Sequence, residues 1–171
     1  MIRVSAIIVP LGPRPGLSER FVRRLLVKRG CKVWRGSFLS SEWHSESVFF
    51  KYNYLRYEEL CRRMAASCGV KAFRRIRAYC KNHHGEPDFI AWDGKKLFFV
   101  EAKLENEQIR RRQLTTMAFL SRYFEIKVYR AFFATRLGEA EIDVEGYLTA
   151  GGVNVKPHVL VRARSPIVGK R

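Results

Sequence analysis

Acidic residues are scarce in this chain of 171 residues: Asp and Glu number 16, whereas Lys and Arg number 33, which gives a formal net charge of +17. Such an excess favours a polyanionic partner, because Lys and Arg that contact phosphates release condensed counterions. Long hydrophobic runs are also absent. No apolar run approaches the roughly 20 residues needed to span a bilayer, and residues 4–9 are too few for the core of a signal peptide. We therefore expect an intracellular, cytoplasmic protein with no membrane partner.

Cysteine is sparse as well, and the four cysteines, Cys31, Cys61, Cys68 and Cys80, have no repeated spacing. Free thiols are the default in an intracellular chain, although a disulfide is conceivable in an extreme thermophile. Cys80 and His83 have ligand-like spacing, but Cys61 and Cys68 form no short knuckle, so the signal for zinc is weak. A zinc-stabilised DNA-binding region at residues 61–84 stays open as an alternative, and it predicts stoichiometric zinc in the purified protein.

The order of secondary-structure signals predicts one domain of the α/β class. Pro and Gly residues at positions 10–16 break regular structure and leave the first residues as a strand or an arm. A helix is expected from Ser18, with an apolar stripe (Phe21, Val22, Leu25 and Leu26) and a terminator at Gly30. A short strand follows at residues 31–35. Residues 36–84 are interpreted as an insertion or elaboration, with two helices divided at Gly69, of which the second carries Val70, Phe73 and Ile76 on one side.

The second half of the chain begins with a hairpin, formed by residues 87–92 and 96–104 around Asp93 and Gly94. A helix is expected over residues 105–123, with Ile109, Met117, Leu120 and Phe124 near one face. A strand should follow at 126–133 and a further one at 153–161. Residues 162–171 form a basic tail.

The hairpin brings charged residues together at one end. A two-residue turn would make Asp88 and Glu101 diagonal neighbours, and a four-residue turn over residues 93–96 would place them directly opposite each other. Lys103 shares the face of Glu101, whereas Phe98, Val100, Ala102 and Leu104 point to the other, apolar side. Two carboxylates held so close carry a desolvation penalty that a divalent cation and a phosphate would offset.

Gly85, Pro87, Asp88 and the run from Phe99 to Lys103 resemble the PD-(D/E)xK superfamily, particularly the VRR-NUC nucleases and the archaeal Holliday-junction resolvases. The similarity covers roughly residues 18–36 and 85–133. It implies a restriction-endonuclease-like core, in which a central mixed β-sheet is flanked by helices, here with a helical insertion.

The resemblance also implies roles for particular residues. Asp88, Glu101 and the backbone carbonyl of Ala102 would bind Mg²⁺, for which Mn²⁺ should substitute, and Lys103 would position or polarise the attacking water. Glu19 matches the acidic residue of the family's first helix and is a further candidate ligand. Gln113 fits the glutamine of the following helix better than Gln108 does. Ordinary first-turn capping for Glu19 and backbone hydrogen bonding for Gln113 are the competing interpretations.

We therefore predict a metal-dependent endonuclease that hydrolyses DNA, selective for Holliday junctions or other branched DNA and homodimeric because a junction resolvase needs two sites. The alternative is a non-catalytic nucleic-acid-binding protein on the same fold. Two arginine sets are candidate phosphate contacts, with a solvated helix face as the competing interpretation: Arg74, Arg75 and Arg77, and Arg110, Arg111 and Arg112. The aromatic group at residues 49–57 is expected to pack in the core or at a dimer contact, with base stacking as the less favoured alternative.

Overall fold

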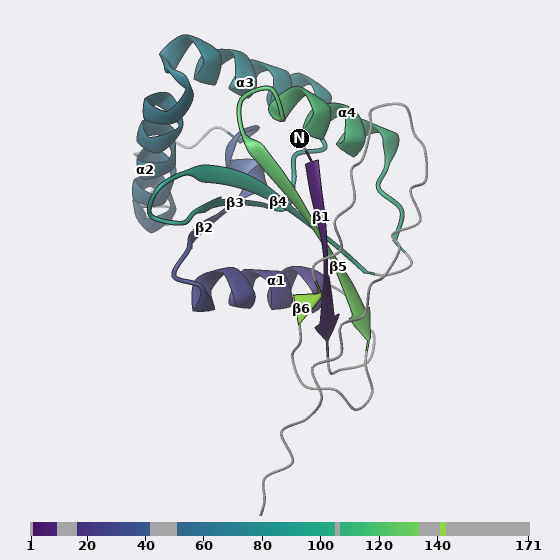
Figure 1. Cartoon of the computed structure of the whole chain (residues 1–171). Coiled ribbons are helices and arrows are strands. Elements are labelled where there is room, and N and C mark those ends of the chain that lie inside the picture. The colour runs from purple at the N-terminus through teal and green to yellow at the C-terminus, as the bar shows by residue number, and fades with distance from the viewer. Residues whose placement is uncertain (1, 10–16, 42–50, 105–106, 134–140, 143–171) are drawn as a thin grey trace, which may run out of the picture.

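The computed structural model describes residues 2–9, 17–41, 51–104, 107–133 and 141–142. Its centre is a six-stranded mixed sheet in the order β2-β3-β4-β5-β1-β6 (Figure 1). The strands are β1 (Ile2–Val9), β2 (Lys32–Arg35), β3 (Phe89–Trp92), β4 (Leu97–Leu104), β5 (Glu125–Phe133) and β6 (Glu141–Ile142). β5 pairs in parallel with β4 and with β1, whereas the β2–β3, β3–β4 and β1–β6 pairs are antiparallel. The first residues of the chain are thus a strand of the sheet.

One face of the sheet is covered by α1 (Leu17–Lys28). Val22 and Leu26 of this helix are fully buried against alternate residues of the strands, including Phe98 and Val100. The helix ends as its sequence predicts: Gly30 adopts a φ of 78°, and the N–H of Cys31 bonds to the carbonyl of Leu26 at 2.9 Å. This is a Schellman motif, in which a left-handed glycine lets the chain turn directly into β2.

The opposite face is covered by α2 (Lys51–Cys68), α3 (Val70–His83) and α4 (Arg111–Leu120), as Figure 1 shows. The expected division at Gly69 is confirmed. Met64 of α2, Ile76 and Cys80 of α3, and Met117 of α4 are all fully buried in one cluster. Residues 51–83 therefore contribute to the main core and are not appended to its outside.

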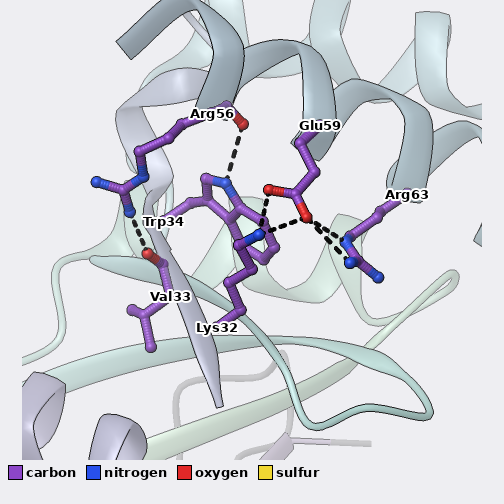
Figure 2. Close-up of polar contacts among 6 residues, drawn as sticks. All are labelled: Lys32, Val33, Trp34, Arg56, Glu59 and Arg63. Carbon is purple, nitrogen blue, oxygen red and sulfur yellow. Dashed lines mark hydrogen bonds and ion pairs between the residues drawn. The ribbon is translucent and has the colours of Figure 1, made fainter. Parts of the chain in front are cut away.

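The helix α2 also covers an edge of the sheet, since β2 is the first strand in the order. The polar contacts between α2 and β2 are drawn in Figure 2. The Arg56 guanidinium donates to the carbonyl oxygen of Val33 at 2.6 Å, and the indole of Trp34 donates to the Arg56 carbonyl at 2.9 Å. Lys32 pairs with Glu59 at 2.6 Å. These contacts use polar groups that a bare edge strand would expose to other chains.

Several expected boundaries differ. The helix expected at 105–123 begins only at Arg111. Residues 107–110 are not helical, and the Glu107 N–H donates a hydrogen bond to the Leu104 carbonyl at 3.0 Å, which forms a turn at the end of β4. Val70 is 57% exposed and does not share the buried side of Phe73 and Ile76. A short 3-10 turn, η1 (Gly36–Phe38), follows β2, and β6 was not anticipated.

The strand at 153–161, the tail at 162–171 and Phe49 and Phe50 lie outside the described residues. Of the aromatic group, Tyr57 is half-buried and packs edge-on against Phe38, which agrees with a core role. No helix in the described part of the chain is long and apolar enough to cross a membrane.

Candidate active site

The β3–β4 hairpin sets the register of the two candidate carboxylates. Trp92 pairs with Leu97 and Phe89 with Val100, so the connecting loop has four residues and Asp88 stands opposite Glu101. The Asp93 side chain holds this loop, since its Oδ1 accepts the N–H groups of Lys95 and Lys96, each at 2.9 Å. Of the two turns that the sequence left open, the four-residue turn is the one adopted.

Glu101 is fully buried, and both of its oxygens have partners. Its Oε1 accepts the side-chain amide of Gln113 at 2.6 Å and pairs with the ammonium of Lys103 at 2.7 Å. Its Oε2 accepts the backbone N–H of Asp88 at 3.3 Å. The structure thus gathers four of the predicted site residues at one end of the hairpin.

The carboxylate of Asp88 is fixed from the neighbouring strand. Its Oδ2 accepts the N–H of Ala102 at 2.7 Å, whereas its Oδ1 accepts no hydrogen bond from the described residues. In an antiparallel ladder the N–H and C=O of one residue face the same side, so the Ala102 carbonyl also lies on the side of Asp88. The backbone beneath Asp88 is held by Gly36, whose N–H donates to the Asp88 carbonyl at 2.9 Å. A Cβ on Gly36 would lie 1.7 Å from the Pro87 carbonyl oxygen, which only glycine avoids.

The electrostatics of the pair favour protonation. Burial, followed by the charge of Asp88, raises the pKa of Glu101 to about 7, although Lys103 opposes the shift. Burial also raises the pKa of Asp88, against the hydrogen bond from Ala102, and the charge of Glu19 adds to the rise. Perturbed carboxylates that share a site are common where a protein stores charge for binding or chemistry.

Glu19 lies close enough to Asp88 to influence its pKa, but it is already paired. Its Oε2 bonds to the guanidinium of Arg35 at 2.5 Å, and its side chain is 36% exposed. The predicted position of Glu19 beside the site is therefore found, with Arg35 as a partner that the sequence did not suggest.

The donor set of this cluster fits a hard divalent cation. Asp88 Oδ1, Glu101 Oε2 and the Ala102 carbonyl are all oxygens, the ligand type that Mg²⁺ prefers together with water and phosphate. Within the described ranges, no three Asp, Glu, His or Cys residues lie together as a metal site. An ion here would therefore need the backbone carbonyl, water or substrate to complete its shell. The same result leaves no described cluster of Cys and His for the zinc alternative, and the four cysteines are free thiols.

Gln113 reaches Glu101 from the first turn of α4. Its Oε1 accepts the backbone N–H of Arg110 at 3.1 Å, while its amide nitrogen donates to Glu101. Gln113 thus makes the backbone hydrogen bond that one interpretation expected and also contacts Glu101, so the two interpretations do not exclude each other. Gly85 allows this approach: its φ is 104°, and an added Cβ would lie 3.2–3.3 Å from the backbone of Arg112 and Gln113.

The two predicted arginine sets differ in exposure. Arg110, Arg111 and Arg112 are exposed at the start of α4, and Arg74 and Arg75 are exposed on α3. Arg77 is half-buried: its guanidinium donates to the Ser41 carbonyl at 3.3 Å and lies 5.4 Å from the Tyr57 ring centre. Its contacts belong to the fold, so Arg77 is poorly placed for a phosphate.

A basic cavity beside Glu19 was missed. It is lined by Arg20, Arg23, Arg24, Arg35 and Arg56, together with Glu19, Val33, Trp34 and Phe89. The spacing of the three α1 arginines, at positions 20, 23 and 24, places them on one face of a helix. That spacing, next to the candidate Glu19, was a signal available in the sequence.

No protein-family model and no curated protein matches this sequence. Among solved structures, the fold is similar to that of paFAN1, determined bound to DNA with a 1-nucleotide 5′ flap and a gap, with a TM-score of 0.53 and 15% sequence identity. The similarity covers 80% of this chain but only 38% of that chain. At this identity it shows the fold alone. The predicted fold class is thereby confirmed: the chain has an α/β, restriction-endonuclease-like fold with a central mixed sheet flanked by helices.

Proposed function

We propose that this protein is a metal-dependent nuclease that hydrolyses DNA phosphodiester bonds at the cluster of Asp88, Glu101, Lys103 and Gln113. The observation that carries the proposal is the fully buried Glu101, held opposite Asp88 and contacted by Lys103 and Gln113. The fold shared with paFAN1, a structure that holds flap DNA, and the net charge of +17 support DNA as the substrate.

Each residue has a role that follows from its contacts. A bound Mg²⁺ or Mn²⁺ would neutralise the two carboxylates and stabilise negative charge on the phosphate oxygens. Gln113 and Lys103 both contact Oε1 of Glu101, so they hold the carboxylate with Oε2 turned toward Asp88. Ala102 fixes Oδ2 of Asp88 and leaves Oδ1 available.

Lys103 is the residue best placed to act on the nucleophile. Its side chain is 14% exposed and its ammonium is anchored by Glu101, so it can donate a hydrogen bond to a water without being free to move away. Attack of that water on phosphorus forms one P–O bond and breaks the bond to the leaving oxygen; the attacking water releases one proton to solvent, and the leaving oxygen takes up one proton from solvent. The pair of Glu19 with Arg35 lies beside Asp88 and would tune its charge, with Glu19 as a further candidate ligand.

Selectivity for branched or flapped DNA, endonucleolytic cutting and a homodimer with two sites belong to the same proposal. The test is cleavage of labelled four-way junction, flap, single-stranded and linear duplex DNA in Mg²⁺, Mn²⁺ or chelator. We expect metal-dependent cutting by the wild type that is lost in Glu101→Ala and kept in Glu58→Ala, an exposed carboxylate of α2. Salt-sensitive DNA binding without cutting would instead establish the non-catalytic alternative.

A further inference from the structure

Three aromatic rings form a stack between α3 and α4. The ring of Tyr79 lies parallel to Phe119, with centres 3.9 Å apart and 10° between planes, and parallel to His83, at 4.0 Å and 7°. Two rings at such distances cannot share one face of Tyr79, so Phe119 and His83 occupy its opposite faces. The order Phe119–Tyr79–His83 therefore leaves the outer face of His83 as the end of the stack.

The end of this stack is open and fixed in orientation. His83 is exposed, whereas Tyr79 is half-buried and Phe119 is 9% exposed. The Nδ1 of His83 lies 3.0 Å from the Tyr79 carbonyl oxygen, which holds the imidazole parallel to the phenol ring. In the part of the chain that the structure describes, no further aromatic ring packs on His83.

The surroundings of the stack suit a nucleotide. All three rings line a groove between the two helices, and Arg75 and Arg122 line it as well. The Arg122 guanidinium lies 6.0 Å from the centre of the Phe119 ring. Flat apolar rings next to exposed guanidinium groups match a nucleobase with its negatively charged phosphate, because bases stack on aromatic side chains and arginine binds phosphate.

The stack is joined directly to the candidate active site. His83 ends α3, and the carbonyl of the following His84 accepts the hydroxyl of Thr116 in α4 at 3.3 Å. Gly85 then packs on the backbone of Gln113, whose side chain contacts Glu101. The groove and the candidate active site are thus linked through residues 84 and 85 and α4.

We propose that the groove between α3 and α4 binds an unpaired nucleobase of DNA, stacked on His83, with Arg75 and Arg122 contacting its phosphates. This inference rests on the proposed function and deepens it. It makes an unpaired nucleotide near the cut a recognised feature of the substrate, whereas a continuous duplex offers no free base to the stack.

Binding experiments in chelator test the stack apart from catalysis. The probes are a fluorescently labelled thymidine oligonucleotide and a strand of equal length whose residues are abasic, so that both carry the same phosphates. We expect His83→Ala to weaken binding of the thymidine strand by about tenfold, the contribution of one stacked base, and to leave binding of the abasic strand unchanged. His83→Phe should restore the loss. Val70→Ala, which shortens an exposed apolar side chain at the other end of α3, is the matched control.

Three results would overturn this proposal: unchanged binding of the thymidine strand by His83→Ala, an equal loss on both strands, or no recovery in His83→Phe. Cleavage in Mg²⁺ judges the proposed function separately. Base-dependent binding without any cleavage would overturn the proposed nuclease activity but would still support base stacking on His83. Cleavage with no base dependence would overturn only the stack.

Discussion

Replacing Glu101 by Gln should stabilise the metal-free protein at alkaline pH. Burial, reinforced by the charge of Asp88, raises the pKa of this carboxyl from 4.5 to about 7. Between these values the folded protein keeps a proton that the unfolded chain releases. The free energy of unfolding therefore falls as pH rises through this window, and it stays lowered above it.

The magnitude follows from the two pKa values. At about 1.4 kcal/mol per pH unit, the ionised carboxyl lowers the stability of the wild type by about 3 kcal/mol at pH 8 and by under about 1 kcal/mol at pH 5. The amide of Glu101→Gln carries no charge at either pH, and its oxygen can still accept the hydrogen bond from Gln113. The difference in free energy of unfolding between the variant and the wild type should therefore shift in favour of the variant by about 2–3 kcal/mol when the pH is raised from 5 to 8.

Urea denaturation in chelator at both pH values measures this difference. Glu58→Gln, at an exposed position of α2, is the control and should change stability by less than about 0.5 kcal/mol. Two results would refute the argument that the ionised, buried Glu101 carboxyl destabilises the metal-free protein. One is a Glu101→Gln variant that is less stable than the wild type at pH 8; the other is a difference in free energy of unfolding that is the same at both pH values.

Three further outcomes follow from the same site. Mg²⁺ at about 100 times its Kd should raise the melting temperature of the wild type by about 5–10 °C at pH 8 in a thermal-shift assay, and Asp88→Asn should abolish the rise; an equal rise in both would place the ion elsewhere. Gly36→Ala should lower the free energy of unfolding by about 2–3 kcal/mol in urea, because its Cβ would overlap the Pro87 carbonyl; unchanged stability would contradict that contact. Gln113→Ala should slow single-turnover cleavage about 10- to 100-fold, the effect of losing one hydrogen bond to a carboxylate, and an unchanged rate would remove Gln113 from the site.

Parts of the site could be predicted because they depend on local geometry alone. Side chains alternate along a strand, so Glu101 and Lys103 had to share one face whatever surrounds them. The apolar positions 98, 100, 102 and 104 fixed the other face as the one toward a core, and the structure places α1 there. The same applies to α1 itself, whose stripe and terminal Gly30 follow from helical periodicity and glycine's access to positive φ.

The length of the hairpin turn was not determined by periodicity, because both turns keep Asp88 and Glu101 on one face. Hydrogen bonds from the loop to Asp93 and the packing of β3 between two strands selected the four-residue turn. The start of α4 was also predicted too early. The apolar spacing of the helix extends back to Ile109, but residues 107–110 belong to the connection between β4 and α4.

The sequence by itself thus determined the faces of most elements, the placement of Asp88 and Glu101 on one face of the hairpin, and the net positive charge, although it assigned Val70 to the wrong side of α3. Periodicity did not determine which distant segments meet. Gln113 at Glu101 and Glu19 beside Asp88 were expected only through the family resemblance, whereas Gly36 beneath Pro87 and Phe119 on Tyr79 were decided by tertiary structure alone. The physical reason is that periodicity is a property of one element. Contacts between elements depend on the packing of all of them, and a close approach of two backbones leaves no sign in sequence beyond a glycine.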